Sequence, residues 1–248
     1  MAEESKAFPA SSRTRVPFAL LLAGLAGASD SIGFLEFSQL FMSFMSGNTT
    51  RFGVAVSTED WDGALRFGSV IALFCFGAFV GTLLAAWSGR WRLAVLLGVQ
   101  AVLFSIGFVS PDGSTAFPLH AYPIVLALGI QNATLQDEQG RSLALTYVTG
   151  TVVRFGAGVA NILLHKPAPS FWIQAPLWAA LTAGAIIGGV MQTRYGEAAF
   201  LFVAALACAL AIVALALTIV LHGSRYTSGE AAQPDAHPDT PRSASITR

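Results

Sequence analysis

The chain has 248 residues, of which 54% are hydrophobic and 11% charged, and its mean hydropathy is +0.62. A soluble domain carries about twice that charged fraction, so the composition indicates an integral membrane protein whose first partner is the lipid bilayer. The formal net charge is zero, which argues against a nucleic-acid-binding surface.

Two polar tails are expected to flank a single membrane domain. Residues 1–15 are of mixed charge, and residues 223–248 are rich in Ser, Thr, Pro, Asp and Gly, so both are predicted to be disordered. A full crossing needs about 20 apolar residues, so one stretch, 121–136, is short. The membrane domain, residues 16–222, contains these apolar stretches: Val16–Leu35, Phe37–Val56, Ala64–Trp87, Leu93–Val109, Ala121–Gln136, Leu143–Leu164, Phe171–Met191 and Ala198–Leu221.

The first stretch has features of a secretory signal peptide, because Arg13 and Arg15 precede an apolar run that ends in small residues. The region around Gly129 repeats this stretch, however, and a repeated structural unit is not expected to be removed. We therefore predict that residues 16–35 form the first membrane helix.

A small polar block occurs twice, as SGNTTRFG at 46–53 and as TGTVVRFG at 149–156. Upstream of each block lies a second matched element, GASDS at 27–31 and GIQNA at 129–133. Matched glycine breaks in a duplicated membrane protein are typical of transporter-like folds. The sequence therefore predicts two internal repeats, at about 16–110 and 119–222.

Glycines at four-residue spacing occur in both predicted repeats. Gly77 and Gly81 lie in the first repeat, and Gly184 and Gly188 lie in the second. Small residues at this spacing let the backbones of two membrane helices approach closely. We predict that both pairs mediate helix packing.

The placement of basic residues indicates how many stretches cross the membrane. If all eight cross and the N-terminus is cytoplasmic, Arg90, Arg92, Arg141 and Arg194 lie outside. If instead 37–56 and 143–164 are broken or re-entrant segments, six crossings remain and both termini are cytoplasmic. The acidic joint Glu59-Asp60-Asp62 then lies outside, a better fit to the positive-inside rule. In that arrangement the following basic residues are cytoplasmic: Lys6, Arg13, Arg15, Arg90, Arg92, Arg141, Lys166 and Arg225.

The fold class predicted is therefore an all-α integral membrane protein with about three spanning helices and one broken or re-entrant segment in each repeat. An odd number of crossings gives the two repeats opposite orientations, and such inverted repeats place a binding site near the middle of the membrane. Parallel repeats with four crossings each are the alternative.

Asp30 is the first candidate for a functional side chain because it lies inside an apolar stretch. A carboxylate at the centre of a membrane helix costs at least about 2.5 kcal/mol on insertion scales. Asp30 is predicted either to contact a solute, an ion or a proton, or to neutralise a buried cation, for which Arg51 or Arg154 would serve. The two roles are not exclusive, since a buried ion pair can also be the element that switches.

The polar blocks supply four more candidates, Asn48, Thr49, Thr149 and Thr151. If helices begin at these breaks, their free backbone amides and their dipoles favour an anion. The alternative is that Asn48 and Thr151 only cap their own helices. Duplication and depth favour a site, because unsatisfied backbone at that depth must line a cavity or be buried in protein.

Arg51 and Arg154 stand one turn into the expected half-helices, at equivalent positions. They are predicted to hold an anionic ligand, to bind lipid head groups, or to neutralise Asp30. Gln131 and Asn132 are polar but uncharged counterparts of the Asp30 region, as expected for a site whose ligand is not itself symmetric.

The sequence predicts no metal site, no cofactor and no enzymatic activity. The four histidines are not paired at the spacing of metal ligands, and Cys75 and Cys208 lie inside apolar runs as packing residues would. The chain contains no phosphate-binding glycine loop, nucleophile elbow or His-Glu-x-x-His motif.

Four ordered motifs carry a resemblance to a known family: AGASDS at 26–31, FMSGNTTRFG at 44–53, LGIQNATLQ at 128–136 and YVTGTVVRFG at 147–156. Together they resemble the YoaK-like family of uncharacterised bacterial membrane proteins, over roughly residues 16–221. The resemblance implies a multi-pass protein of the bacterial inner membrane. It implies no substrate, reaction or cofactor, because the family is a domain of unknown function.

The favoured function is a transporter or exchanger of an unidentified small solute or ion, with its site at the paired helix breaks. A channel would also use broken helices, but it needs a continuous wet pore. A non-transporting membrane partner or sensor is the third possibility, and its polar C-terminal tail would then be the functional part.

Overall fold

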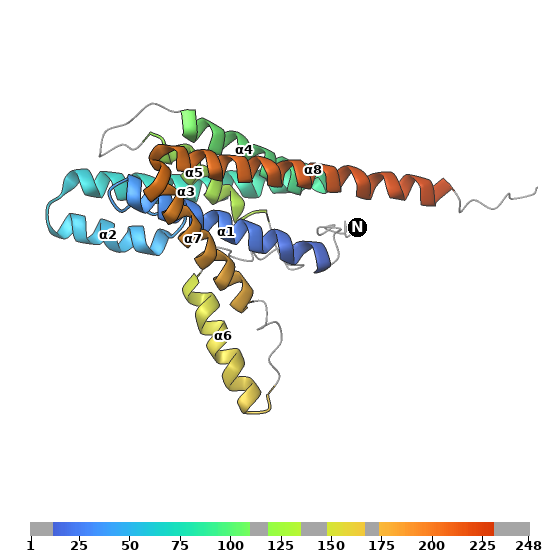
Figure 1. Cartoon of the computed structure of the whole chain (residues 1–248), viewed down its shortest axis with the longest axis horizontal. Helices are drawn as coiled ribbons and strands as arrows, with labels where there is room; N and C mark the ends of the chain where they lie inside the picture. The colour runs from blue at the N-terminus through green and yellow to red at the C-terminus, as the bar shows by residue number, and fades with distance from the viewer. Residues whose placement is uncertain (1–11, 110–118, 135–147, 167–173, 231–248) are drawn as a thin grey trace, which may run out of the picture.

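The computed structural model describes residues 12–109, 119–134, 148–166 and 174–230, and within these residues the protein is helical with no β-strand. Two short 3₁₀ helices, η1 (Gly89–Trp91) and η3 (Gly196–Ala198), join long helices (Figure 1). The α-helices are α1 (Ser12–Glu36), α2 (Met45–Ser57), α3 (Trp61–Ser88), α4 (Arg92–Val109), α5 (Ala121–Gln131), α6 (Val148–Leu163), α7 (Gln174–Tyr195) and α8 (Ala199–Glu230). Of the joint between the predicted stretches 93–109 and 121–136, residues 110–118 lie outside the described residues, and so does the whole joint 137–142.

Four helical stretches in the described part of the chain are long and apolar enough to cross a membrane. The last of them covers α7 and most of α8 and is 47 residues long, enough for two crossings of about 20 residues each. Gly196, with a φ of 56°, separates these two helices. The four stretches are Val16–Glu36, Trp61–Ser88, Arg92–Val109 and Gln174–Val220.

The predicted stretch 37–56 is helical only from Met45 onward, because residues 37–44 form a loop that doubles back along α1. The chain reverses at Ser38 and Gln39, which have positive φ values of 48° and 67°. After the reversal, Ser43 reaches Asp30, which lies six residues before the end of α1. Helix α2 therefore begins close to a point on α1 that lies between one and two turns before the end of that helix.

Helix boundaries elsewhere follow the apolar stretches to within a few residues. The largest difference is at α8, which continues to Glu230, whereas the sequence predicts that the tail begins at residue 223. Once a helix is formed, adding residues to its end is easier than starting it, so it extends past the apolar run. Helix α5 is short, with 11 residues that rise about 16 Å, roughly half of a bilayer's hydrocarbon core.

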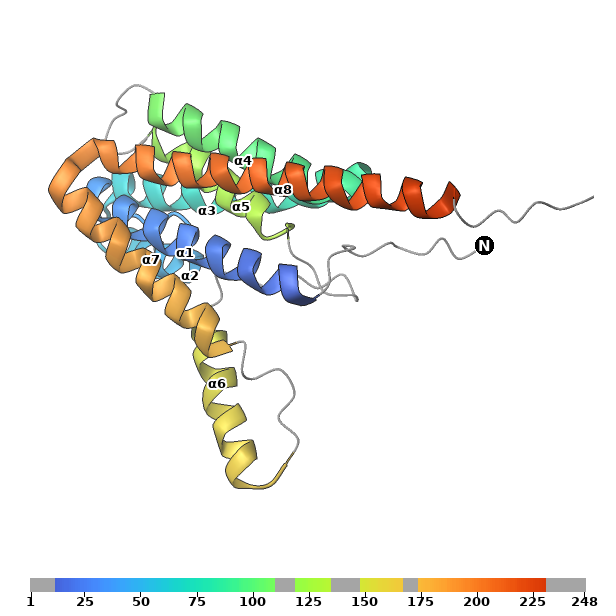
Figure 2. The same cartoon turned by 45° about the vertical axis from the view of Figure 1, so that its right-hand side comes forward.

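The helices pack mainly in pairs. Helix α1 packs on α7, α3 packs on α5, and α4 packs on α8, while α2 lies against α3 and α6 against α7. Figures 1 and 2 show α1, α4 and α7 running away from the side labelled N, and α3, α5 and α8 running back toward it. Helix α6 projects from the bundle and is nearest to it at its first residues (Figure 2).

Helices α1 and α7 touch through their backbones. A methyl group added at Gly184 would lie 2.0 Å from the backbone oxygen of Gly24, and one at Gly188 would lie 2.5 Å from that of Ala28. Real Cβ atoms do not approach backbone atoms so closely, so glycine is required for this contact. The packing role predicted for this glycine pair is confirmed.

Helices α3 and α5 make a contact of the same kind. A methyl group at Gly77 would lie 2.5 Å from the backbone oxygen of Leu126, and one at Gly81 would lie 2.9 Å from that of Ile130. On the facing helix, a methyl group at Gly129 would lie 2.5 Å from a backbone oxygen of α3. The packing role predicted for Gly77 and Gly81 is confirmed as well.

Candidate functional site

The carboxylate of Asp30 is held by the loop that doubles back along α1. The backbone N–H of Ser43 donates to Oδ1 at 2.6 Å, and the Ser43 hydroxyl donates to Oδ2 at 2.7 Å. The backbone N–H groups of Met42 and Phe44 also interact with this carboxylate. Phe44 is the residue that precedes α2, so the negative charge lies at the positive end of that helix dipole.

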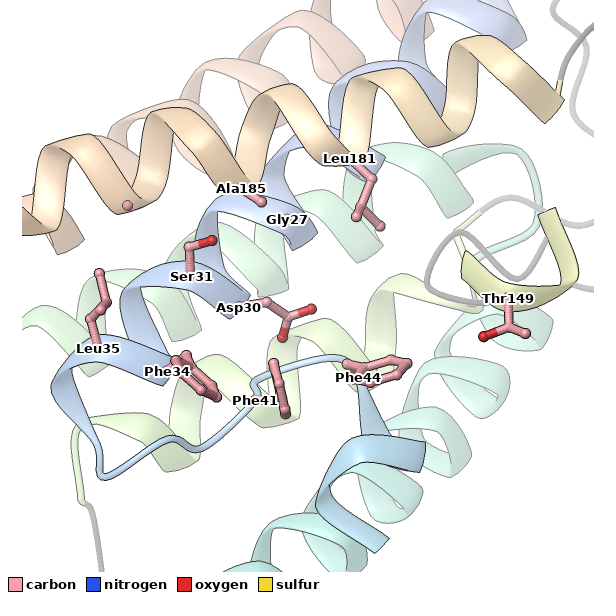
Figure 3. A pocket seen from close by; sticks show the side chains of 11 residues that line it. Gly27, Asp30, Ser31, Phe34, Leu35, Phe41, Phe44, Thr149, Leu181 and Ala185 are labelled. Carbon is pink, nitrogen blue, oxygen red and sulfur yellow. The ribbon is translucent and has the colours of Figure 1, made fainter. Parts of the chain in front are cut away.

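Asp30 lies at a pocket of about 520 Å³ between α1, the loop, α7 and the first turn of α6 (Figure 3). A volume of this size is typical of a small-molecule site. Most of the wall is apolar, and its polar side chains are Asp30, Ser31 and Thr149. The complete lining is Gly27, Asp30, Ser31, Phe34, Leu35, Phe41, Phe44, Thr149, Leu181, Ala185 and Gly189.

Three phenylalanine rings surround the acidic end of this pocket. The ring centroids of Phe34 and Phe41 are 5.0 Å apart, and those of Phe41 and Phe44 are 5.2 Å apart in an edge-to-face arrangement. A methyl group at Gly47 would lie 2.6 Å from the Phe44 ring and 2.9 Å from the Phe41 ring. The first glycine of the polar block is therefore required for the placement of these two rings.

Comparison with known proteins gives the family of this chain. Residues 18–214 match the family described as protein of unknown function (DUF1275). The chain belongs to the DUF1275 family. It is 35% identical over 210 residues to the UPF0700 transmembrane protein RA0705 of Rhizobium meliloti strain 1021. The aligned region covers 84% of this chain and 89% of that relative. No solved structure matches the chain.

The family result confirms the resemblance carried by the four motifs and, with the apolar helices, the membrane class predicted from composition. A DUF1275 protein brings no assigned substrate with it. The chemistry available to this member therefore depends on where its own side chains lie.

Asn48 of the DUF1275 chain is a structural residue in this arrangement. It is fully buried, and its side-chain amide accepts a hydrogen bond from the Phe41 N–H at 3.1 Å and donates one to the Phe41 carbonyl at 2.7 Å. It does not cap α2, which has no side-chain cap. Thr49 is exposed and donates to the Met45 carbonyl of its own helix.

The two arginines have partners other than Asp30. Arg51 donates to the side-chain oxygen of Gln39, and its guanidinium lies 5.4 Å from the centroid of the Phe34 ring. The hydrogen bond fixes the residue at which the loop reverses with positive φ. Arg154 is exposed and donates through Nε to the side-chain oxygen of Gln174 at 3.3 Å.

Of the remaining candidates, Thr149 lines the pocket, whereas Gln131 at the end of α5 and Asn132 next to it do not. Gln131 donates to the carbonyl of Leu22 in α1 at 3.0 Å, and Asn132 donates to the carbonyl of Leu128 in its own helix. The side chain of Thr151 lies outside the described part of the structure. Asp30 and Thr149, one from each predicted repeat, are therefore the sequence-predicted residues that share this pocket.

Sequence reasoning missed the loop residues that complete the site. Ser43, Phe41 and Phe44 in the loop, and Phe34 in α1, look like ordinary loop and membrane residues, and the local sequence marks them only weakly. One signal was available, because FMSFMSG at 41–47 repeats an aromatic residue after three positions, directly before the break.

In chemical terms, the site offers one carboxylate, aromatic faces and two hydroxyls in an otherwise apolar pocket. Within the described residues, no group of three metal-binding side chains is found.

Proposed function

We propose that this protein is a small-solute transporter of the bacterial inner membrane, and that the pocket at Asp30 is its solute site. The pocket itself carries the proposal. It joins a charged residue inside a membrane helix, a helix break and the start of α6 in one ligand-sized volume. Ionisable residues placed in this way mark solute and ion pathways in membrane proteins.

The proposal includes two inverted halves, α1 to α4 and α5 to α8. Each of the main helix pairings in the described residues has a counterpart when the halves are exchanged, such as α1 with α7 and α5 with α3. Positions 24 and 28, which face Gly184 and Gly188, correspond to positions 126 and 130, which face Gly77 and Gly81. The offset between these positions is the one that relates Gly27 to Gly129. Counterpart helices also run in opposite directions, which supports inversion (Figures 1 and 2).

Two other functions are less well supported. A channel needs a continuous wet path, whereas the walls of this pocket are mainly leucine, phenylalanine and small residues. A sensor or assembly partner would need no pocket open to both sides of the membrane. The following two experiments need no knowledge of the solute: the first tests the proposed topology, and the second tests whether the pocket is reached from both sides of the membrane, as a sensor would not require.

The first experiment tests the six-crossing topology. Cys75 and Cys208 are replaced by alanine, and single cysteines are introduced as Asp60→Cys and Lys166→Cys. Because basic joints are retained in the cytoplasm, we expect a membrane-impermeant thiol reagent to label position 60 in intact cells and position 166 only after permeabilisation. Labelling of position 166 but not of position 60 in intact cells would refute this topology.

The second experiment tests alternating access, with Ser31→Cys in the same cysteine-free background. Ser31 lines the pocket, whereas Ser29, two residues before it, is 1% exposed and donates to the Leu25 carbonyl, so Ser29→Cys is the matched control. A carrier presents its site to each side in turn, so position 31 should react with impermeant reagent in both right-side-out and inside-out vesicles. Position 29 should react in neither. Reaction of position 31 from a single side would instead favour the sensor.

A further inference from the structure

We infer that the pocket recognises a small organic cation, of the alkylammonium class. This inference rests on the transporter proposal for the location of the site and extends it to the class of solute. It starts from the charge of the pocket. Among the described residues that line it, Asp30 is the one with a formal charge.

The partners of Asp30 hold its carboxylate in place but do not neutralise it. They are backbone N–H groups and a serine hydroxyl, which are dipoles without net charge. Neither arginine that the sequence offered is paired with Asp30: Arg51 binds Gln39 and lies over the Phe34 ring, and Arg154 binds Gln174. A cation in the pocket would therefore supply the countercharge that the described side chains around Asp30 do not.

The aromatic rings beside the carboxylate favour a particular kind of cation. Aromatic faces attract ammonium groups, and grouped aromatic rings are the usual arrangement that binds alkylated ammonium ions such as choline. Arg51 already lies over the Phe34 ring, so Phe41 and Phe44 are the rings expected to contact the ligand. Figure 3 shows Asp30 directed toward these two rings.

The remaining wall favours an alkylated ion over a hydrated metal ion. A metal ion needs several oxygen ligands, and the pocket offers one carboxylate that is already hydrogen-bonded and two hydroxyls. Leu35, Leu181 and Ala185 present apolar surface that matches methyl or ethyl groups. Since the loop already donates to both carboxylate oxygens, recognition depends on charge and ring contact more than on a hydrogen bond from the ligand.

The test uses a charged probe and its uncharged isostere. Binding of choline and of 3,3-dimethylbutan-1-ol to the purified full-length protein in detergent is measured by isothermal titration calorimetry, with tetraethylammonium as a second cation. We expect choline to bind at least about tenfold more tightly than the isostere, because charge and ring contacts favour the cation alone. Equal binding of the two, or no binding of either cation up to about 10 mM, would overturn the inference.

Variants locate the site. Asp30→Asn should remove most of the choline preference and leave the affinity for the isostere unchanged, and Phe41→Leu and Phe44→Leu should each weaken choline binding by about 3- to 30-fold. The controls are Asp62→Asn at the exposed start of α3 and Phe79→Leu on an exposed face of α3, and neither should change binding. A choline preference that survives Asp30→Asn would place the cation elsewhere and refute the inference.

Counterflow of radiolabelled choline in proteoliposomes separates this inference from the transporter proposal. Specific choline binding without counterflow would support the cation site and contradict the transporter. Counterflow of a neutral or anionic solute that choline does not inhibit would support the transporter and contradict the cation site.

Discussion

Gly184→Ala and Gly77→Ala are each expected to destabilise the protein by about 1–3 kcal/mol or more, the usual cost of overpacking a well-packed contact. The added methyl groups would lie 2.0 Å and 2.5 Å from backbone oxygens of the facing helices. A side chain could rotate away, but a backbone oxygen can move only with its whole helix. The measurement is the thermal unfolding midpoint in detergent, together with the yield of monodisperse protein.

The matched controls are Gly98→Ala in α4 and Gly53→Ala in α2, because a methyl group at either position meets nothing within 4 Å. Alanine is favoured over glycine in a helix by up to about 1 kcal/mol, so these two variants should be neutral or slightly stabilising. The same chemical change is thus expected to have opposite signs at contacted and open positions. Wild-type stability of Gly184→Ala would contradict the close contact of α1 and α7.

Comparable losses in Gly184→Ala and Gly77→Ala would also bear on the proposed duplication. These two glycines make counterpart contacts, one between α1 and α7 and the other between α3 and α5. If one substitution disrupts the fold and the other has no effect, the two halves do not contribute equivalent contacts. That result would contradict the proposed symmetry of the two helix contacts.

Asp30→Asn is expected to fold normally and to lose solute transport. The asparagine oxygen can accept the Ser43 N–H, and the asparagine NH₂ can donate to the Ser43 hydroxyl, because a hydroxyl is both donor and acceptor. What the variant loses is the negative charge. Transport should therefore fall to background, while membrane yield and the unfolding midpoint stay near those of the wild type.

Asp30→Ala provides the comparison, because it removes both hydrogen bonds as well as the charge. The buried Ser43 N–H would lose its acceptor, which costs about 1–3 kcal/mol. We expect this variant to have a lower yield and a lower midpoint than Asp30→Asn. Poor folding of Asp30→Asn that a second change, Arg51→Gln, restores would show that Asp30 neutralises a buried cation, and it would defeat the solute-site proposal.

The membrane class and the helices follow from the sequence because they depend on local properties. A run of about 20 apolar residues predicts a spanning helix wherever it occurs, and α3 and α4 begin and end within three residues of the predicted stretches. Glycine spacing is local as well, so the packing faces at Gly77 and Gly184 were predictable. Asp30 stood out because a carboxylate in an apolar run is costly in a membrane.

The partners of Asp30 were decided by tertiary structure. The sequence offered Arg51 and Arg154 as countercharges, but the loop reversal at Ser38 and Gln39 brings Ser43 to the carboxylate instead. The same reversal buries Asn48 against the Phe41 backbone, where it holds the loop and lies outside the pocket. Residue types and spacing along one chain do not specify how a loop folds back. Polarity and periodicity therefore determined that this protein is a helical membrane protein with a buried-type acidic residue, Asp30, in one apolar stretch and a helix break in the next. Only the packing of loop 37–44 between α1 and α2 determined which side chains meet at that break.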